Sequence, residues 1–133
     1  LGGGITGVIT TYLNDHREVG HPGVEMVVLP TMAERKTELL RLSEGIVTLP
    51  GGLGSMDELF EALTLAQLHT YPHPIGLLNV EGFYDPVILQ LEKMIEHGFI
   101  RENNRSLFLF DDDIDRLLDR MAAYEYRADP KWH

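Results

Sequence analysis

Short apolar segments alternate with helical segments along most of this sequence, and the alternation restricts the possible fold more than any other feature. Apolar runs with β-branched content and nearby turn residues are typical of buried strands, and they occur at residues 5–9, 24–29, 45–49, 75–80 and 107–110. Between them lie stretches with apolar residues at helical spacing, at about residues 33–43, 55–70, 83–98 and 112–126. Strands that are apolar throughout and alternate with helices predict a parallel sheet covered on both faces. We therefore expect an α/β chain built around a mainly parallel sheet.

Length and composition limit the classes of protein and partner. With 133 residues, of which 44% are apolar, the chain is expected to form a single domain over residues 1–133, with residues 127–133 as a loosely held tail. The 21 acidic residues outnumber the 11 lysines and arginines and give a net charge of −10, which argues against nucleic-acid and anionic-membrane partners. The absence of cysteine excludes disulfides and thiolate sites. Without an apolar run of about 18 residues, the chain is expected to be soluble and cytoplasmic.

Residues 50–58, with the sequence PGGLGSMDE, join a predicted strand directly to a predicted helix. Such a junction places free backbone N–H groups and the positive end of the helix dipole at the carboxyl edge of the sheet, where they can bind an anion. Three glycines, Gly51, Gly52 and Gly54, can adopt positive φ and let a ligand approach the backbone. Ser55 is expected to cap the helix or to donate its hydroxyl to a phosphate oxygen. The pattern is neither G-x-G-x-x-G nor Walker A, which argues against nucleoside triphosphates as ligands.

An ordinary strand-to-helix turn explains the same spacing. In this interpretation Ser55 caps the helix, while Asp57 and Glu58 only favour its dipole. Glu58 nevertheless argues for a ligand, because a carboxylate beside a bound phosphate is unfavourable unless it serves the sugar. Upstream, Arg35 and Lys36 lie at the head of a predicted helix on the same edge of the sheet, although a solvated helix face is the more ordinary explanation for them.

Other polar residues have ordinary explanations. The six histidines lack the spacing of metal ligands, so we expect no metal site. The three aspartates at residues 111–113 are expected to cap the last helix, with a cation site as the alternative. The lysines at positions 36, 93 and 131 lie in no recognisable pyridoxal phosphate context, which argues against lysine decarboxylation.

Three segments closely resemble one known family. They are MAERK at residues 32–36, PGGLGSMDE at residues 50–58, and the later GLLNVEGFYDP with EHGFI. Together they are similar to the LOG family, the cytokinin riboside 5'-monophosphate phosphoribohydrolases, whose members are often described as lysine decarboxylases. The resemblance covers residues 2–121. It implies a Rossmann-like, doubly wound α/β domain in a homodimer. It also implies hydrolysis of the N-glycosidic bond of a nucleoside 5'-monophosphate, AMP or an N6-modified AMP, to free base and ribose 5-phosphate, without a cofactor.

The resemblance also implies a set of site residues. Arg35 and Glu58 are the expected catalytic pair. The expected substrate-binding residues are Glu18, Lys36, Gly51, Gly52, Leu53, Gly54, Ser55, Met56, Asp57 and Thr64. Loss of the base leaves an oxocarbenium-like ribose, and the carboxylate of Glu58 would stabilise that charge or orient water. Arg35 would neutralise either the phosphate or the charge that develops on the leaving base.

The sequence departs from the family pattern at several positions. Ser55 stands in place of the usual threonine and keeps the hydroxyl, whereas Ala33 replaces a common histidine and Leu65 replaces a common tryptophan. The last two changes alter the expected base pocket. The start of the chain corresponds to the family's third strand. We therefore expect the first two strands of the full domain to be absent and the chain to be a C-terminal portion of it.

Two other classes of function remain open. A non-catalytic nucleotide-binding or carrier module of the same fold would use the same phosphate cradle. Glu58 separates this class from an enzyme, because a pure binder gains little from a carboxylate at that place. A structural subunit that uses the helices at residues 55–70 and 83–98 as its interface is compatible with catalysis and predicts a dimer.

Overall fold

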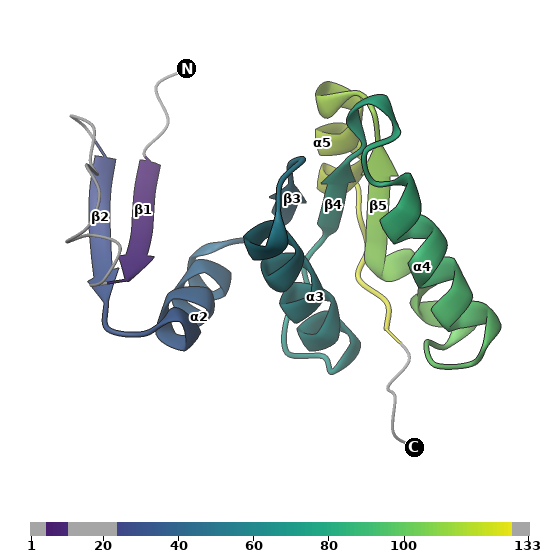
Figure 1. Cartoon of the computed structure of the whole chain (residues 1–133), viewed down its shortest axis with the longest axis horizontal. Coiled ribbons are helices and arrows are strands. Elements are labelled where there is room, and N and C mark those ends of the chain that lie inside the picture. Colours follow the sequence, from purple (N-terminus) through teal and green to yellow (C-terminus); the bar gives the residue numbers. More distant parts are fainter. Residues whose placement is uncertain (1–4, 11–23, 129–133) are drawn as a thin grey trace. The chain divides into compact units, whose positions relative to one another are not determined.

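The structure is a computed structural model that describes residues 5–10 and 24–128. The chain divides after Ser43 into two compact units, which are described separately (Figure 1). The prediction of a single domain stays a prediction, and residues 129–133 of the predicted tail lie outside the described residues. No helix in the described ranges is long and apolar enough to cross a membrane.

The first unit contains two parallel strands and a helix. Strand β1 (Ile5–Thr10) pairs with strand β2 (Val24–Leu29), with Ile5 opposite Val24 and Thr10 opposite Leu29. Helix α2 (Met32–Leu42) follows after a short turn, and the hydroxyl of Thr31 caps it by accepting a hydrogen bond from the N–H of Glu34 at 3.1 Å. The predicted strands and helix of this segment are confirmed to within one residue. Threonine outside the helix and glutamate three residues later is the pattern expected of such a start.

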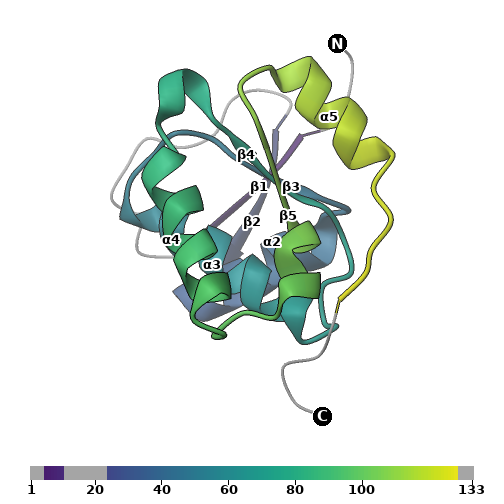
Figure 2. The ribbon, with the colours of Figure 1, turned by 90° about the vertical axis from the view of Figure 1, so that its right-hand side faces the viewer.

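The second unit is a three-stranded parallel sheet with helices on both faces, and it confirms the predicted α/β class. Its strands lie in the order β3 (Ile46–Thr48), β4 (Ile75–Leu78) and β5 (Phe108–Asp111). Its helices are α3 (Leu53–Gln67), η1 (Val80–Gly82), α4 (Asp85–Glu96), η2 (Glu102–Leu107) and α5 (Ile114–Ala122). Helices α3 and α4 connect successive strands and lie on one face, whereas α5 covers the other (Figures 1 and 2). This arrangement places the β3–α3 turn at the carboxyl ends of the strands.

The core of this unit is centred on β4, which is buried on both sides. Ile75 and Leu77 are fully buried, and alternation along a strand puts Gly76 on the opposite face. A Cβ atom at Gly76 would lie 2.8 Å from Met121 Sδ and 3.1 Å from Leu117 Cδ1. The missing side chain therefore lets α5 pack directly against the strand. The sequence prediction of a buried central strand is confirmed, although β4 is shorter than the predicted range of residues 75–80.

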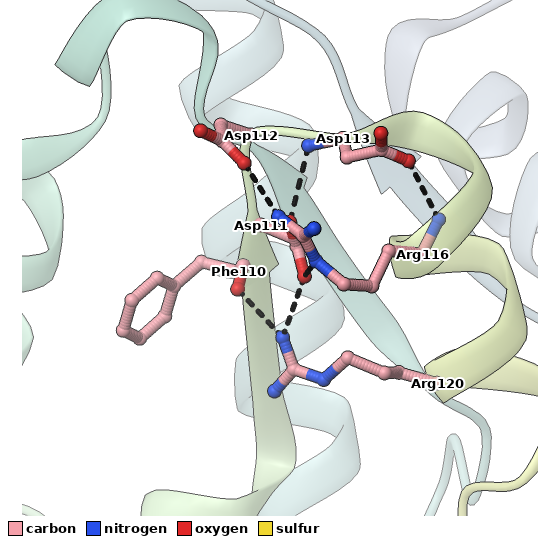
Figure 3. Close-up of polar contacts among 6 residues, drawn as sticks. All are labelled: Phe110, Asp111, Asp112, Asp113, Arg116 and Arg120. Carbon is pink, nitrogen blue, oxygen red and sulfur yellow. Dashed lines mark hydrogen bonds and ion pairs between the residues drawn. The ribbon is translucent and has the colours of Figure 1, made fainter.

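Asp111, at the end of β5, joins the sheet to α5 (Figure 3). Arg116 Nη2 donates to Asp111 Oδ1 at 2.6 Å, and Arg120 Nη1 contacts Asp111 Oδ2 at 3.3 Å and donates to the carbonyl oxygen of Phe110 at 2.8 Å. Asp113 is the N-cap of α5, since its side chain accepts from the N–H of Arg116 at 2.9 Å. Capping is therefore confirmed for Asp113 but wrong for Asp111, whose carboxylate is the centre of an ion-pair cluster.

Replacing Asp111 by asparagine is expected to lower the thermal midpoint of unfolding at pH 7 by several degrees. Hydrogen bonds from Arg116 and from the N–H of Asp113 hold the pKa of the Asp111 carboxyl well below its ordinary value of 3.8. A lowered folded-state pKa stabilises the protein above the ordinary value, and this stabilisation is lost as the pH falls towards the folded-state value. Circular dichroism melts at pH 7, 5 and 3 should show the difference between wild type and variant shrinking at pH 3. Asp112→Asn, with a side chain 72% exposed, is the control, and equal midpoints of wild type and Asp111→Asn at pH 7 would refute the cluster's role.

Candidate functional site

The turn between β3 and α3 leaves the start of α3 without a side-chain cap. Gly52 is the N-cap residue, and no side chain bonds to the cap position. The first hydrogen bond of the helix runs from the N–H of Met56 to the carbonyl oxygen of Gly52 at 3.2 Å. Helix geometry therefore leaves the N–H groups of Leu53, Gly54 and Ser55 without an acceptor inside the helix. Together with the helix dipole, these groups form a site suited to an anion.

The glycines of this turn do not adopt the conformation predicted for them. In the described part of the chain, the glycines with positive φ are Gly82 and Gly98, so the prediction for Gly51, Gly52 and Gly54 is wrong. A Cβ atom at Gly51 would lie 2.2 Å from Ser55 Oγ, whereas Cβ atoms at the other two glycines of the turn would meet nothing within 4 Å. Gly51 thus packs closely against the side chain of Ser55. Gly52 and Gly54 leave open space beside the backbone.

Ser55 does not cap α3, because the helix begins two residues earlier than the sequence predicted. Ser55 is the third helical residue, and its side chain lies over Gly51. In this fully described helix the first turn contains no acidic residue. The ordinary interpretation of the turn needed a serine cap and two acids near the dipole, and the structure contains neither feature. The structure therefore does not support the capping interpretation of this turn.

Glu58 lies in the second turn of α3, whereas a helix start at residue 55, as predicted, would have placed it in the first turn. It is half-buried and takes part in a polar interaction, as does the exposed Asp57. At 1.5 Å per residue, Glu58 is about 7.5 Å along the helix axis from Leu53. Its side chain starts toward the N-terminus of the helix, as all helical side chains do. Glu58 and the open N–H groups thus belong to the same end of one helix.

Thr64 is placed too far along α3 to share a contact with the turn. It comes eleven residues after Leu53, a distance of about 16 Å along the axis. Its hydroxyl donates to the carbonyl oxygen of Phe60 at 2.7 Å, inside its own helix. Thr64 nevertheless lines the same hollow along α3 as Leu53 and Asp57. A role for this residue in binding stays a prediction.

Arg35 and Lys36 belong to the first unit, where both are half-buried residues of α2 with polar interactions of their own. The N–H of Arg35 donates to the carbonyl oxygen of Thr31 at 3.0 Å, so the residue is part of the first regular turn of the helix. Because the two units are described separately, the pairing of Arg35 with Glu58 stays a prediction. Glu18 lies outside the described residues.

Apolar surface begins beside the open helix start. Leu53 is 90% exposed, and it borders a hollow of about 460 Å³ along α3, lined also by Met56, Phe60 and Leu65. A second hollow of about 490 Å³ lies between α3, α4 and η2. No group of three or more histidine, aspartate or glutamate residues in the described ranges is arranged to hold a metal ion. The start of α3 thus combines N–H groups without helical acceptors with neighbouring apolar surface.

Tyr84 contacts the same turn and was missed by the sequence analysis. Its hydroxyl donates to the carbonyl oxygen of Leu49, the residue that precedes the proline and glycines of the turn. The two residues are 35 positions apart, so no local spacing in the sequence could reveal the bond. The available signal was only a tyrosine in the segment GFYDP, next to a predicted helix start.

Comparison with known proteins identifies relatives along nearly the whole chain. Residues 1–121 match the family described as possible lysine decarboxylase. The chain is 35% identical over 124 residues to a cytokinin riboside 5'-monophosphate phosphoribohydrolase of Arabidopsis thaliana, an alignment that covers 93% of this chain and 54% of that protein. It is 35% identical over 130 residues to a protein of the same name from Oryza sativa subsp. japonica, covering 96% and 54%. A probable enzyme of this name from the same rice is 37% identical over 123 residues, covering 92% and 54%. The chain thus spans about half the length of these curated relatives.

Proposed function

This chain belongs to the family described as possible lysine decarboxylase, the LOG family that its motifs resemble, and we propose that the protein hydrolyses nucleoside 5'-monophosphates. The substrate is a purine nucleotide, AMP or an N6-modified AMP of the cytokinin type. The products are free base and ribose 5-phosphate. The observation that carries this proposal is the open start of α3, where three N–H groups without helical acceptors lie one turn before Glu58. The names of the relatives support the same reaction.

The open helix start is the proposed site of the 5'-phosphate. The N–H groups of Leu53, Gly54 and Ser55 would bind the phosphate oxygens, and the bare backbone at Gly52 and Gly54 would let the phosphate come close. The axial separation of about 7.5 Å between Leu53 and Glu58 leaves room for a ribose ring between the phosphate and the carboxylate. The same arrangement explains why no acidic residue occupies the first turn.

Glu58 is the proposed stabiliser of the transition state. Departure of the base leaves positive charge on the ribose, and a carboxylate near the anomeric carbon stabilises that charge or orients the attacking water. Arg35, with Lys36 beside it, would balance the charge of the phosphate or of the leaving base. Met56, Asp57, Thr64 and Glu18 complete the proposed binding set. No cofactor is required for this hydrolysis.

The assembly and location of the protein are part of the same proposal. Large apolar side chains are exposed on α3, on α4 and in the segment after α4, including Leu53, Leu89 and Phe99. Such side chains favour a homodimer interface. The net charge of −10 argues against nucleic-acid and anionic-membrane partners, and a cytoplasmic location is part of the proposal.

Incubation of the full-length protein with AMP and with isopentenyladenosine monophosphate tests this function. We expect release of free adenine and isopentenyladenine in equal amounts with ribose 5-phosphate, measured by liquid chromatography. Parallel incubation with lysine, followed for carbon dioxide and cadaverine, examines the reaction that the family description mentions. Cadaverine without base release would refute the proposal. Tight binding of both nucleotides without base release would instead support the non-catalytic nucleotide-binding module.

A further inference from the structure

Tyr84 connects two loops at the carboxyl ends of neighbouring strands. It follows η1, lies just before α4, and is fully buried. Its hydroxyl donates to the carbonyl oxygen of Leu49, which lies at the end of β3. Because burial raises the pKa of the Tyr84 hydroxyl, the group keeps its proton and remains a hydrogen-bond donor at neutral pH. The side chain therefore links the β4–α4 connection to the β3–α3 turn.

The position of Tyr84 is itself fixed by several contacts. Its N–H donates to Asn79 Oδ1 at 2.7 Å, while Asn79 Nδ2 donates to Asp85 Oδ1 at 2.8 Å. The N–H of Asn79 also donates to the carbonyl oxygen of Asp111 at 2.8 Å, which ties the connection to β5. The ring of Phe83 packs edge-on against the Tyr84 ring, with centroids 5.0 Å apart. The hydroxyl of Tyr84 is thus held at the end of a rigid support.

Apart from the packing of Ser55 over Gly51, little within the β3–α3 turn fixes its backbone. Pro50 has no N–H to donate, and Gly52 receives no side-chain bond as the N-cap of α3. Adjacent glycines give the backbone wide conformational freedom. A bond at the carbonyl of Leu49 therefore restrains the turn where its own residues do not.

We propose that Tyr84 is a positioning residue for the glycine turn: through Leu49 it orients the open N–H groups of α3 for the phosphate of the substrate. The inference rests on the proposed function of the turn. It predicts a specific effect on ligand binding. A small shift of the N–H groups would weaken their hydrogen bonds to an anion but would leave the helix folded. A hydroxyl that only contributed to folding would have no such effect.

Tyr84→Phe tests the proposal, with Tyr126→Phe as a matched control. The hydroxyl of Tyr126 donates to the carbonyl oxygen of Ala66 at 2.6 Å, near the opposite end of the same helix, and burial raises its pKa as well. Both variants keep the ring and lose a bond to a backbone carbonyl, and Tyr126→Phe also loses the contact of the hydroxyl with His69 Nδ1 at 3.1 Å. We expect similar small decreases in thermal midpoint. Only Tyr84→Phe should raise the KM for AMP and the Kd for ribose 5-phosphate, each by about tenfold, with kcat changed less than KM.

Hydrogen exchange of the backbone amides at residues 51–55 gives a second measurement that needs no ligand. Faster exchange in Tyr84→Phe, but not in Tyr126→Phe, is the expected result. Unchanged exchange and unchanged Kd in Tyr84→Phe would overturn the positioning role even if wild type releases base. Equal weakening of binding by both variants would also overturn it, because the effect would then follow stability. If wild type binds no ribose 5-phosphate, the proposal that the turn binds a phosphate is refuted. The proposed positioning role of Tyr84 is then refuted as well.

Discussion

Replacing Glu58 by glutamine is expected to lower kcat for base release by about 10³-fold, within the range found for a charged group that acts only in the transition state. Glutamine keeps the size of the side chain but removes its negative charge and replaces one acceptor oxygen by an NH2 donor. The KM for AMP should change little, because the proposed phosphate contacts come from the backbone of Leu53 to Ser55. Rates at saturating AMP, measured on a protein whose circular dichroism matches wild type, separate lost chemistry from lost folding.

Glu61→Gln is the matched control for this experiment. Glu61 is one helical turn after Glu58, is also half-buried, and also takes part in a polar interaction. It lies about 4.5 Å further from the helix start along the axis, beyond the proposed ribose. We expect the control to retain most of the wild-type rate. Undiminished base release by Glu58→Gln, or an equal loss in both variants, would remove Glu58 from the proposed catalytic role.

The sequence predicted where the site lies better than it predicted the geometry of the site. Periodicity and apolar runs identify the strand before Pro50 and the helix after it, because burial on a sheet and on a helix face leaves a repeat in the sequence. The first residue of a helix leaves no such repeat in the sequence. Serine is a common N-cap, yet here the backbone turns at Gly52 and Ser55 packs over Gly51. That shift of two residues moves Glu58 from the first turn to the second.

Contacts between distant residues were beyond sequence reasoning for a different physical reason. The bond between Tyr84 and Leu49 and the ion pairs of Asp111 with Arg116 and Arg120 depend on how loops pack at the sheet edge. A charged triplet before a helix is an ordinary capping signal, so nothing local distinguished Asp111 as an ion-pair centre. The relation of Arg35 to Glu58 depends in the same way on the placement of the two units. It stays a prediction from the resemblance.

Gly54→Ala is expected to stabilise the protein while weakening its function. Gly54 is the second residue of α3, and a Cβ atom there would meet nothing within 4 Å. Alanine in a helix is favoured over glycine by about 0.5–1 kcal/mol, so the thermal midpoint should rise. If a phosphate approaches the bare backbone, however, the added methyl group occupies part of its position. We expect kcat/KM for AMP to fall on the order of 10²-fold, as when a donor to a bound anion is lost.

Gly98→Ala is the control for Gly54→Ala, because it is expected to lower stability without weakening ligand binding. Gly98 also has open space around a Cβ position, but its φ of +79° is unfavourable for alanine by about 1–2 kcal/mol. Its variant should melt earlier than wild type and still gain the full increase in thermal midpoint when ribose 5-phosphate is added. Gly54→Ala should melt later and gain little from the ligand. A Gly54→Ala protein that is stabilised by ribose 5-phosphate as strongly as wild type would show that no phosphate approaches this backbone, because a ligand that tolerates the methyl group must bind elsewhere.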